Sequence, residues 1–202
     1  MVRGIDKFRE YFRDFSDHYI IIGGTARDYA ISEAGFTPKG TKDIDIVLII
    51  EALSTKFVRR FWEFIKNGSY GNLSAIMLND VYYHFIIGHC SIFDGLRLAR
   101  IEALICFKAI AWLDLTERKE RGEQIDSHKI NKHRTDIFRL GATLAPADIY
   151  DLPKQIKSDL QAFAKKANNN LPGKEIFTKM GLQGLKADQV LKQLINSFKL
   201  ND

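Results

Sequence analysis

Two cysteines and the absence of any long hydrophobic run set the first limits on this 202-residue chain. Cys90 and Cys106 are widely spaced among apolar residues, so we expect buried free thiols rather than a disulfide framework or a zinc site. The longest purely apolar stretches, such as residues 46–50, are far too short to cross a bilayer. The first residues alternate in charge, unlike a signal peptide. These features predict a cytoplasmic protein with no membrane partner.

Low-complexity tracts and disordered tails are also lacking, and the composition is that of a globular protein. Hydrophobic residues make up 46% of the chain and charged residues 27%, and the length suits one domain or two small lobes. The formal net charge is +5 and the pI is about 9.1. This excess of positive charge permits binding to a polyanion such as RNA, although many basic proteins bind no nucleic acid.

Hydrophobic periodicity changes along the chain near residue 95. Before that point it predicts helices over 4–15, 25–34 and 54–67 and strands over 19–22, 43–50, 73–78 and 81–87. The last two strands would form a hairpin around Asn79–Asp80, and the strand over 43–50 would be central in the sheet. After residue 95 the chain predicts helices over 99–118, 128–142, 147–168 and 186–199. We therefore expect an α+β fold, with an α/β lobe at 1–95 and a helical lobe at 96–202.

The strand over 19–22 runs directly into Gly23, Gly24 and Thr25 at the start of a helix. Glycine lets the backbone approach a ligand closely, and the first amides and the dipole of a helix favour a phosphate. The spacing matches neither the three-glycine dinucleotide fingerprint nor a P-loop. Alone, the glycine pair is more typical of a tight strand-to-helix connection.

Asp43 and Asp45 stand two residues apart at the start of the next strand, so their carboxylates are expected on one face. Two like charges at that distance repel each other, and a divalent cation would relieve the repulsion. Oxygen ligands favour Mg²⁺ or Mn²⁺. An isolated Asp-x-Asp is more often a solvated strand start, but here it follows a strand, a Gly-Gly-Thr and a helix.

This order of elements resembles the signature of the DNA polymerase β-like nucleotidyltransferase superfamily. The resemblance implies that the glycines and Thr25 hold a nucleoside triphosphate and that Asp43 and Asp45 bind metal ions. The segment 23–28, Gly-Gly-Thr-Ala-Arg-Asp, is also similar to an element of CCA-adding enzymes and poly(A) polymerases. The long helical body of those enzymes is not evident here, so we do not transfer their function.

The helical lobe supplies three further candidate residues. Lys108 is the one charge in the apolar stretch 103–113, where it either reaches water or points into a cleft. Lys132 and Asp136 share a helical face at i, i+4 spacing, which on its own suits a solvated face with an internal ion pair. These residues resemble the helical half of AbiEii-type nucleotidyltransferases, the toxins of toxin–antitoxin pairs. The resemblance implies that Lys108 and Lys132 contact phosphates and that Asp136 orients one of the lysines.

Two departures from that branch bear on activity. His133 stands where the branch usually has an Asp. Active members also carry a third carboxylate on a later strand, and neither Glu51, Asp80 nor Asp94 is a convincing replacement. The fold prediction survives these departures, whereas the prediction of activity is weakened.

Three hypotheses follow from the sequence. The leading one is a Mg²⁺- or Mn²⁺-dependent nucleotidyltransferase of AbiEii type, which uses an NTP and an acceptor for which RNA, including tRNA, is a candidate. Asp43, Asp45, Lys108 and Asp136 would be catalytic, and Gly23, Gly24, Thr25 and Lys132 would bind the nucleotide. The second is a protein of this fold that no longer catalyses and instead binds nucleotide, RNA or a partner protein. The third is a structural partner in a complex with a cognate antitoxin.

Overall fold

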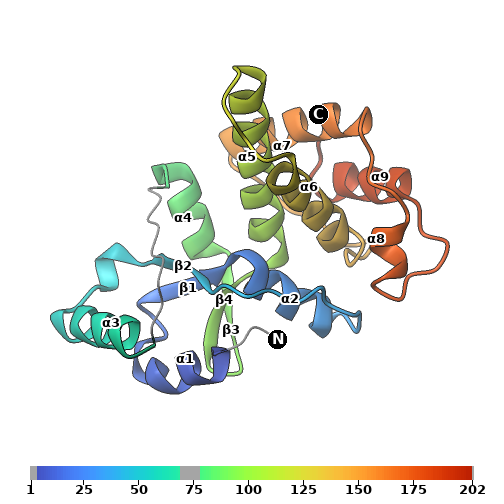
Figure 1. Cartoon of the computed structure of the whole chain (residues 1–202). Coiled ribbons are helices and arrows are strands. Elements are labelled where there is room, and N and C mark those ends of the chain that lie inside the picture. The colour runs from blue at the N-terminus through green and yellow to red at the C-terminus, as the bar shows by residue number, and fades with distance from the viewer. Residues whose placement is uncertain (1–3, 69–77, 202) are drawn as a thin grey trace.

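The computed structural model describes residues 4–68 and 78–201 and shows a mixed α+β architecture (Figure 1). The first part of the chain contains α1 (Ile5–Tyr11), η1 (Arg13–Phe15), β1 (Tyr19–Ile22), α2 (Gly23–Glu33), β2 (Asp45–Leu48), η2 (Ile50–Ala52), α3 (Thr55–Gly68), α4 (Asp80–Gly88), β3 (Cys90–Phe93) and β4 (Leu96–Ala99). The rest is helical, with α5 (Ile101–Glu120), α6 (Ser127–Gly141), α7 (Lys154–Asn168), α8 (Glu175–Thr178) and α9 (Ala187–Ser197).

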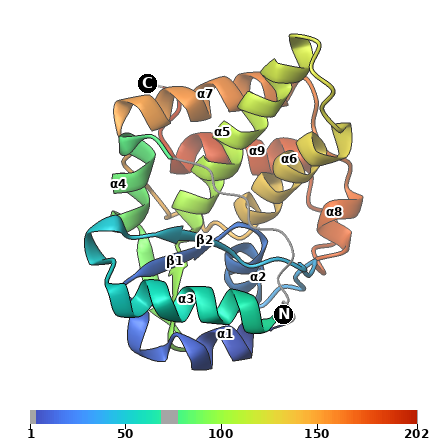
Figure 2. The same ribbon diagram turned by 60° about the vertical axis from the view of Figure 1, so that its left-hand side comes forward.

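The four strands of the described residues form one mixed sheet in the order β2-β1-β4-β3. β1 pairs antiparallel with β2 and parallel with β4, and β3 pairs antiparallel with β4. The register of the first pair places Ile22 opposite Asp45. Both views show the sheet between α1 and α3 on one side and the helical part on the other (Figures 1 and 2).

β1 is the buried centre of this sheet. Tyr19, Ile20 and Ile21 are fully buried. Tyr19 meets the ring of Phe8 from α1 edge to face, with ring centroids 5.0 Å apart, and Phe12 also contacts it. This aromatic cluster fixes the strand against α1 and thereby the point at which α2 begins.

The expectation that 43–50 would be a central strand was wrong. Only Asp45–Leu48 are in the strand, and β2 lies at the edge of the described sheet. Its apolar run is only partly covered: Val47 is buried, Ile46 is half-buried and Ile50 is exposed. An edge position leaves the start of β2 open to solvent, which matters for the two aspartates there.

The prediction of a hairpin over 73–87 was also wrong. Its first strand lies almost wholly in residues 69–77, which are outside the described part, but its second strand is not present. Residues 80–88 form α4, and the Asn79 side chain caps it by accepting a hydrogen bond from the Tyr82 amide at 3.1 Å. The run is rich in residues that favour strands, but Tyr82, Phe85 and Ile86 share a buried helical face. Tertiary packing therefore overrides the local preference.

The hairpin that does exist lies further on, between β3 and β4. Asp94 and Gly95 connect the strands with φ angles of 49° and 73°, the left-handed pair that a tight hairpin turn needs. An Asp-Gly between two short apolar runs is a recognisable hairpin signal. The boundary expected near residue 95 falls in this turn, and β4 belongs to the sheet.

Four long helices follow β4, close to the positions that the periodicity predicts. α5 packs against α6 and α7, and α6 packs against α9. The helix expected from 147 begins instead at Lys154, after Pro153. Within the described ranges, none of the helices is sufficiently long and apolar to span a membrane.

Gly141, at the end of α6, is a sensitive packing point, and we predict that Gly141→Ala destabilises the protein. A Cβ at Gly141 would lie 2.9 Å from Val190 Cγ1 and 3.0 Å from Leu194 Cγ on α9. Gly88 ends α4 with no atom within 4 Å of the same position, so Gly88→Ala is the matched control. Denaturant unfolding should show a loss of about 1 kcal/mol for Gly141→Ala and no loss for Gly88→Ala. Equal stability of the two variants would contradict the close α6–α9 contact.

Candidate functional site

The site begins where β1 passes into α2 without an intervening loop. The strand ends at Ile22 and the helix begins at Gly23, which has a left-handed φ of +65°. No side chain caps this end of the helix. The helix therefore starts with amides that a polar or anionic group can use.

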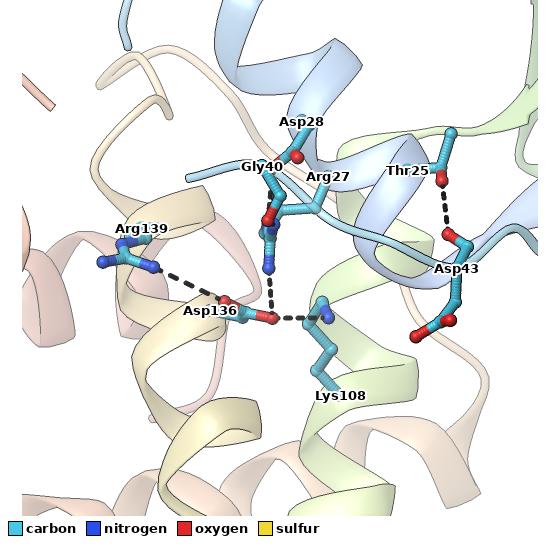
Figure 3. Close-up of polar contacts among 8 residues, drawn as sticks. All are labelled: Thr25, Arg27, Asp28, Gly40, Asp43, Lys108, Asp136 and Arg139. Carbon is cyan, nitrogen blue, oxygen red and sulfur yellow. Dashed lines mark hydrogen bonds and ion pairs between the residues drawn. The ribbon is translucent and has the colours of Figure 1, made fainter. Parts of the chain in front are cut away.

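The segment leading into β2 lies directly against the first turn of α2. A Cβ at Gly23 would lie 1.9 Å from Asp45 Oδ2, and one at Gly24 would lie 2.6 Å from Thr41 Oγ1. The Thr25 hydroxyl donates to the Asp43 carbonyl at 2.9 Å (Figure 3). The two glycines are therefore needed for this close approach, because any side chain there would displace Asp45 or Thr41.

Asp43 and Asp45 are held at this turn, and their side chains are exposed. Within the described part of the chain, neither carboxylate has a hydrogen-bond or ion-pair partner. The Asp45 carboxylate lies against Gly23, and the backbone of Asp43 is fixed by Thr25. The Asp45 carboxylate thus lies at the start of an uncapped helix, with the unpaired Asp43 side chain two residues away, and a hard divalent cation takes such oxygen ligands.

A third carboxylate does not join this pair among residues 4–68 and 78–201, where no group of three or more His, Cys, Asp or Glu could hold a metal. The sequence of residues 69–77 contains none of these residue types. Mg²⁺ commonly binds through one or two carboxylates together with the phosphates of a substrate. The pair therefore fits a cation that needs a phosphate ligand to complete its shell.

Asp136 lies in a second cluster, between the sheet part and the helical part. It projects from α6 and is fully buried. Its Oδ2 accepts hydrogen bonds from Lys108 Nζ on α5 at 2.9 Å and from Arg27 Nη1 on α2 at 2.8 Å (Figure 3). Arg139 Nη1 forms an ion pair with Oδ1 at 3.8 Å. The expected pairing of Asp136 with a lysine is thus present, and the lysine is Lys108.

Arg27 is a central residue of this cluster that the sequence interpretation left without a role. Its side chain is 1% exposed and also donates to Asp28 Oδ1, at 2.9 Å from Nε and 2.5 Å from Nη2. Nη2 further contacts the Gly40 carbonyl at 3.4 Å. The sequence signal for Arg27 was the adjacent Arg-Asp pair in a helix that is otherwise mostly apolar at that turn. Arg and Asp are rarely buried unless they are paired, so such a pair indicates a buried ion-pair cluster.

Burial and ion pairing shift the pKa values of Lys108 and Asp136 in opposite directions. Burial lowers the pKa of Lys108 below its usual value, and Asp136 only partly opposes that effect. For Asp136, burial alone would raise the pKa, but the charges of Lys108 and Arg27 outweigh it, and the pKa is lowered. The carboxylate therefore stays ionised as the common partner of three cations.

Lys132 and His133, on α6, also lie close to Lys108. Lys132 is exposed, whereas His133 is partly buried and its Nδ1 has no hydrogen-bond partner in the described residues. Burial and then the charge of Lys108 lower the pKa of His133 to about 4. His133 is therefore neutral at pH 7. It does not supply the negative charge of the Asp that AbiEii-type proteins usually have at this position.

α2 connects the two clusters. Its first turn contacts the aspartate segment through Gly23, Gly24 and Thr25, and one turn later Arg27 binds Asp136. The structure thus places both sets of predicted residues on or against one short helix. Chemically, it combines unpaired carboxylates, uncapped amides and buried cations, the groups that bind a metal–phosphate complex.

We predict that Asp136→Asn strongly destabilises the fold, because it leaves Arg27 and Lys108 buried without a shared carboxylate. Removal of one partner of a buried ion pair typically costs about 3 kcal/mol or more. Asp151→Asn is the control, since Asp151 forms an exposed ion pair with Lys199. Denaturant unfolding should show a large loss for the first variant and almost none for the second. Near-wild-type stability of Asp136→Asn would contradict the central role of this carboxylate.

His133 should make stability depend on pH. Its folded-state pKa of about 4 lies below the value near 6.5 expected when unfolded, so between these values only the unfolded chain binds the proton. The free energy of unfolding should therefore fall by about 2 kcal/mol as the pH drops from 7 to 4, given the partial exposure of the ring. His133→Gln should lack this contribution in parallel urea titrations. An imidazole that protonates near pH 6.5 by NMR would contradict the prediction.

Comparisons of the chain with models of known protein families, with curated proteins and with solved structures find no match. The resemblance to nucleotidyltransferases therefore remains a prediction from the sequence. The function proposed next depends on the geometry of the described residues and on that resemblance.

Proposed function

We propose that this protein is a nucleotidyltransferase that binds an NTP with Mg²⁺ or Mn²⁺ and transfers a nucleotide to an acceptor hydroxyl. The observation that carries the proposal is the convergence on α2 of the aspartate segment and the Asp136 cluster. Asp45 lies against Gly23, and Arg27, one turn later, holds Asp136 and with it Lys108.

Asp43 and Asp45 would hold the cation through their exposed carboxylates. When bound, such a cation offsets the negative charge that develops on the phosphates during transfer. Thr25 has one hydroxyl proton and donates it to the Asp43 carbonyl, so we assign it to positioning Asp43 rather than to donating to a phosphate. Gly23 and Gly24 would provide amides at the start of α2.

Lys108 would donate from Nζ to a phosphate oxygen. Its present partner, Asp136 Oδ2, also accepts from Arg27, so that carboxylate keeps a hydrogen-bonded cation if Lys108 turns away. In the transfer, the acceptor oxygen bonds to the α-phosphorus, the bond from that phosphorus to the bridging oxygen breaks, and pyrophosphate leaves. The acceptor hydroxyl loses its proton to water.

RNA, including tRNA, remains the candidate acceptor, because the chain carries a formal net charge of +5. A cognate antitoxin protein remains a candidate partner on the resemblance alone.

A second function is favoured by two specific observations. No third carboxylate joins the aspartate pair in the described residues, and the spaces beside Gly23 and Gly24 are filled by Asp45 and Thr41. Both suit a protein that keeps the fold and binds a nucleotide, RNA or a partner protein without catalysis.

Calorimetric titration of NTPs, with and without Mg²⁺, tests the proposal without knowledge of the acceptor. We expect Mg²⁺-dependent binding to the wild type and a loss of affinity of at least about tenfold, ~1.4 kcal/mol, in Asp45→Asn. Asp188→Asn, an exposed acid on α9, is the control and should bind like the wild type. An NTP affinity that is the same with and without Mg²⁺, and the same in the wild type and Asp45→Asn, would contradict the proposed metal site.

A further inference from the structure

An unusual number of cations surrounds the buried Asp136 carboxylate. Lys108 and Arg27 bond to it directly, and Arg139 pairs with it at 3.8 Å. Two exposed lysines, Lys39 and Lys132, lie close enough to influence the same groups electrostatically. Among the described residues, these five cations share the carboxylates of Asp136 and of Asp28, the other partner of Arg27.

Lys39 reaches this cluster from the loop between α2 and β2. Hydrogen bonds on either side of Lys39 hold this loop in place. The Thr37 amide donates to the Met180 carbonyl at 3.4 Å, and Arg27 donates to the Gly40 carbonyl at 3.4 Å. Burial lowers the pKa of Lys39, Asp136 opposes the shift, and Arg139, Arg27 and Lys132 add to it. The loop thus places Lys39 within electrostatic range of Asp136 and Arg139, beside other positive charges.

The positive charge of this cluster is not neutralised within the described part of the chain. The side-chain ammonium groups of Lys39 and Lys132 have no ion-pair or hydrogen-bond partner there. Arg139 is 6% exposed, yet its Nη1 makes no hydrogen bond. Crowded cations repel one another, and a bound anion would lower the free-energy cost of that repulsion.

We infer that Lys39, Lys132 and Arg139, with Lys108 behind them, form an anion site for the two terminal phosphates of an NTP and for free inorganic pyrophosphate. The inference extends the proposed function by adding Lys39 and Arg139 to the phosphate-binding residues. Lysine and arginine are the usual partners of phosphate oxygens. Site occupancy needs no metal, since the charge comes from the side chains.

The position of the site along α2 suits the terminal phosphates. The aspartate pair lies at Gly23, and the cation cluster begins at Arg27. Four residues of an α-helix rise about 6 Å, comparable to the reach of a short polyphosphate chain. An α-phosphate beside Asp43 and Asp45 would therefore place the terminal phosphates towards Lys39 and Lys132.

Calorimetric titration with inorganic pyrophosphate, in metal-free buffer containing a chelator, tests the site. We expect the wild type to bind and Lys39→Gln to bind about fivefold more weakly. Lys66→Gln removes the same charge from the end of α3, well away from α6 in both views, and should bind like the wild type (Figures 1 and 2).

The same titration at pH 9, in two buffers of different ionisation enthalpy, measures protons taken up on binding. Lys39 and Lys108 have lowered pKa values in the free protein. The titratable and charged groups that surround them are Asp136, Arg139, Arg27, Lys132 and His133. A bound anion should raise both pKa values, so the wild type should take up protons and Lys39→Gln should take up fewer.

The outcomes separate this inference from the proposed function. Equal pyrophosphate affinity in the wild type and Lys39→Gln, or no binding at all, would overturn the anion site, even if Mg²⁺-NTP binding still depended on Asp45. Weaker pyrophosphate binding in Lys39→Gln than in the wild type would support the anion site, even if Asp45→Asn left the Mg²⁺-NTP affinity unchanged.

Discussion

The buried Asp136 carboxylate, shared by Lys108 and Arg27, is the interaction on which the rest of the structure depends. It joins three helices: α2 from the sheet part and α5 and α6 from the helical part. A carboxylate withdrawn from water must be compensated by charge and hydrogen bonds, so the three helices can pack closely here only with all partners present. The same contact fixes the rotation of α2, and hence where its first turn presents Gly23 and Thr25 to the aspartate segment.

Local patterns predicted the parts of the site that are close in sequence. The β-branched run before Gly23 and Gly24 predicted the passage from strand to helix. The helical periodicity also placed Lys132 and Asp136 on one helix, but Asp136 is buried and pairs with Lys108 instead of lying on a solvated face. The Asp-x-Asp spacing predicted two carboxylates at a strand start, although only Asp45 is in the strand and the strand lies at the sheet edge. These features follow from helix and strand geometry, which acts over a few residues.

Long-range packing decided the parts that the sequence did not predict. Arg27 and Asp136 are 109 residues apart, and no local pattern indicates that they meet. Residues 80–88 favour a strand by composition, yet Asn79 caps a helix there because Tyr82, Phe85 and Ile86 pack on one side. The Asp94–Gly95 turn carries a recognisable hairpin signal that the sequence analysis missed, because the periodicity after residue 95 predicts only helices.

The functional proposal depends on whether the exposed carboxylates at one end of α2 and the cations one turn away bind one ligand. A crystal structure with a non-hydrolysable NTP analogue and Mn²⁺, located by its anomalous scattering, is the most direct measurement. We predict an anomalous peak between Asp43 and Asp45 with the phosphate chain running towards Lys108 and Lys39. A peak elsewhere, or a nucleotide bound away from α2 at saturating concentration, would contradict the proposed site.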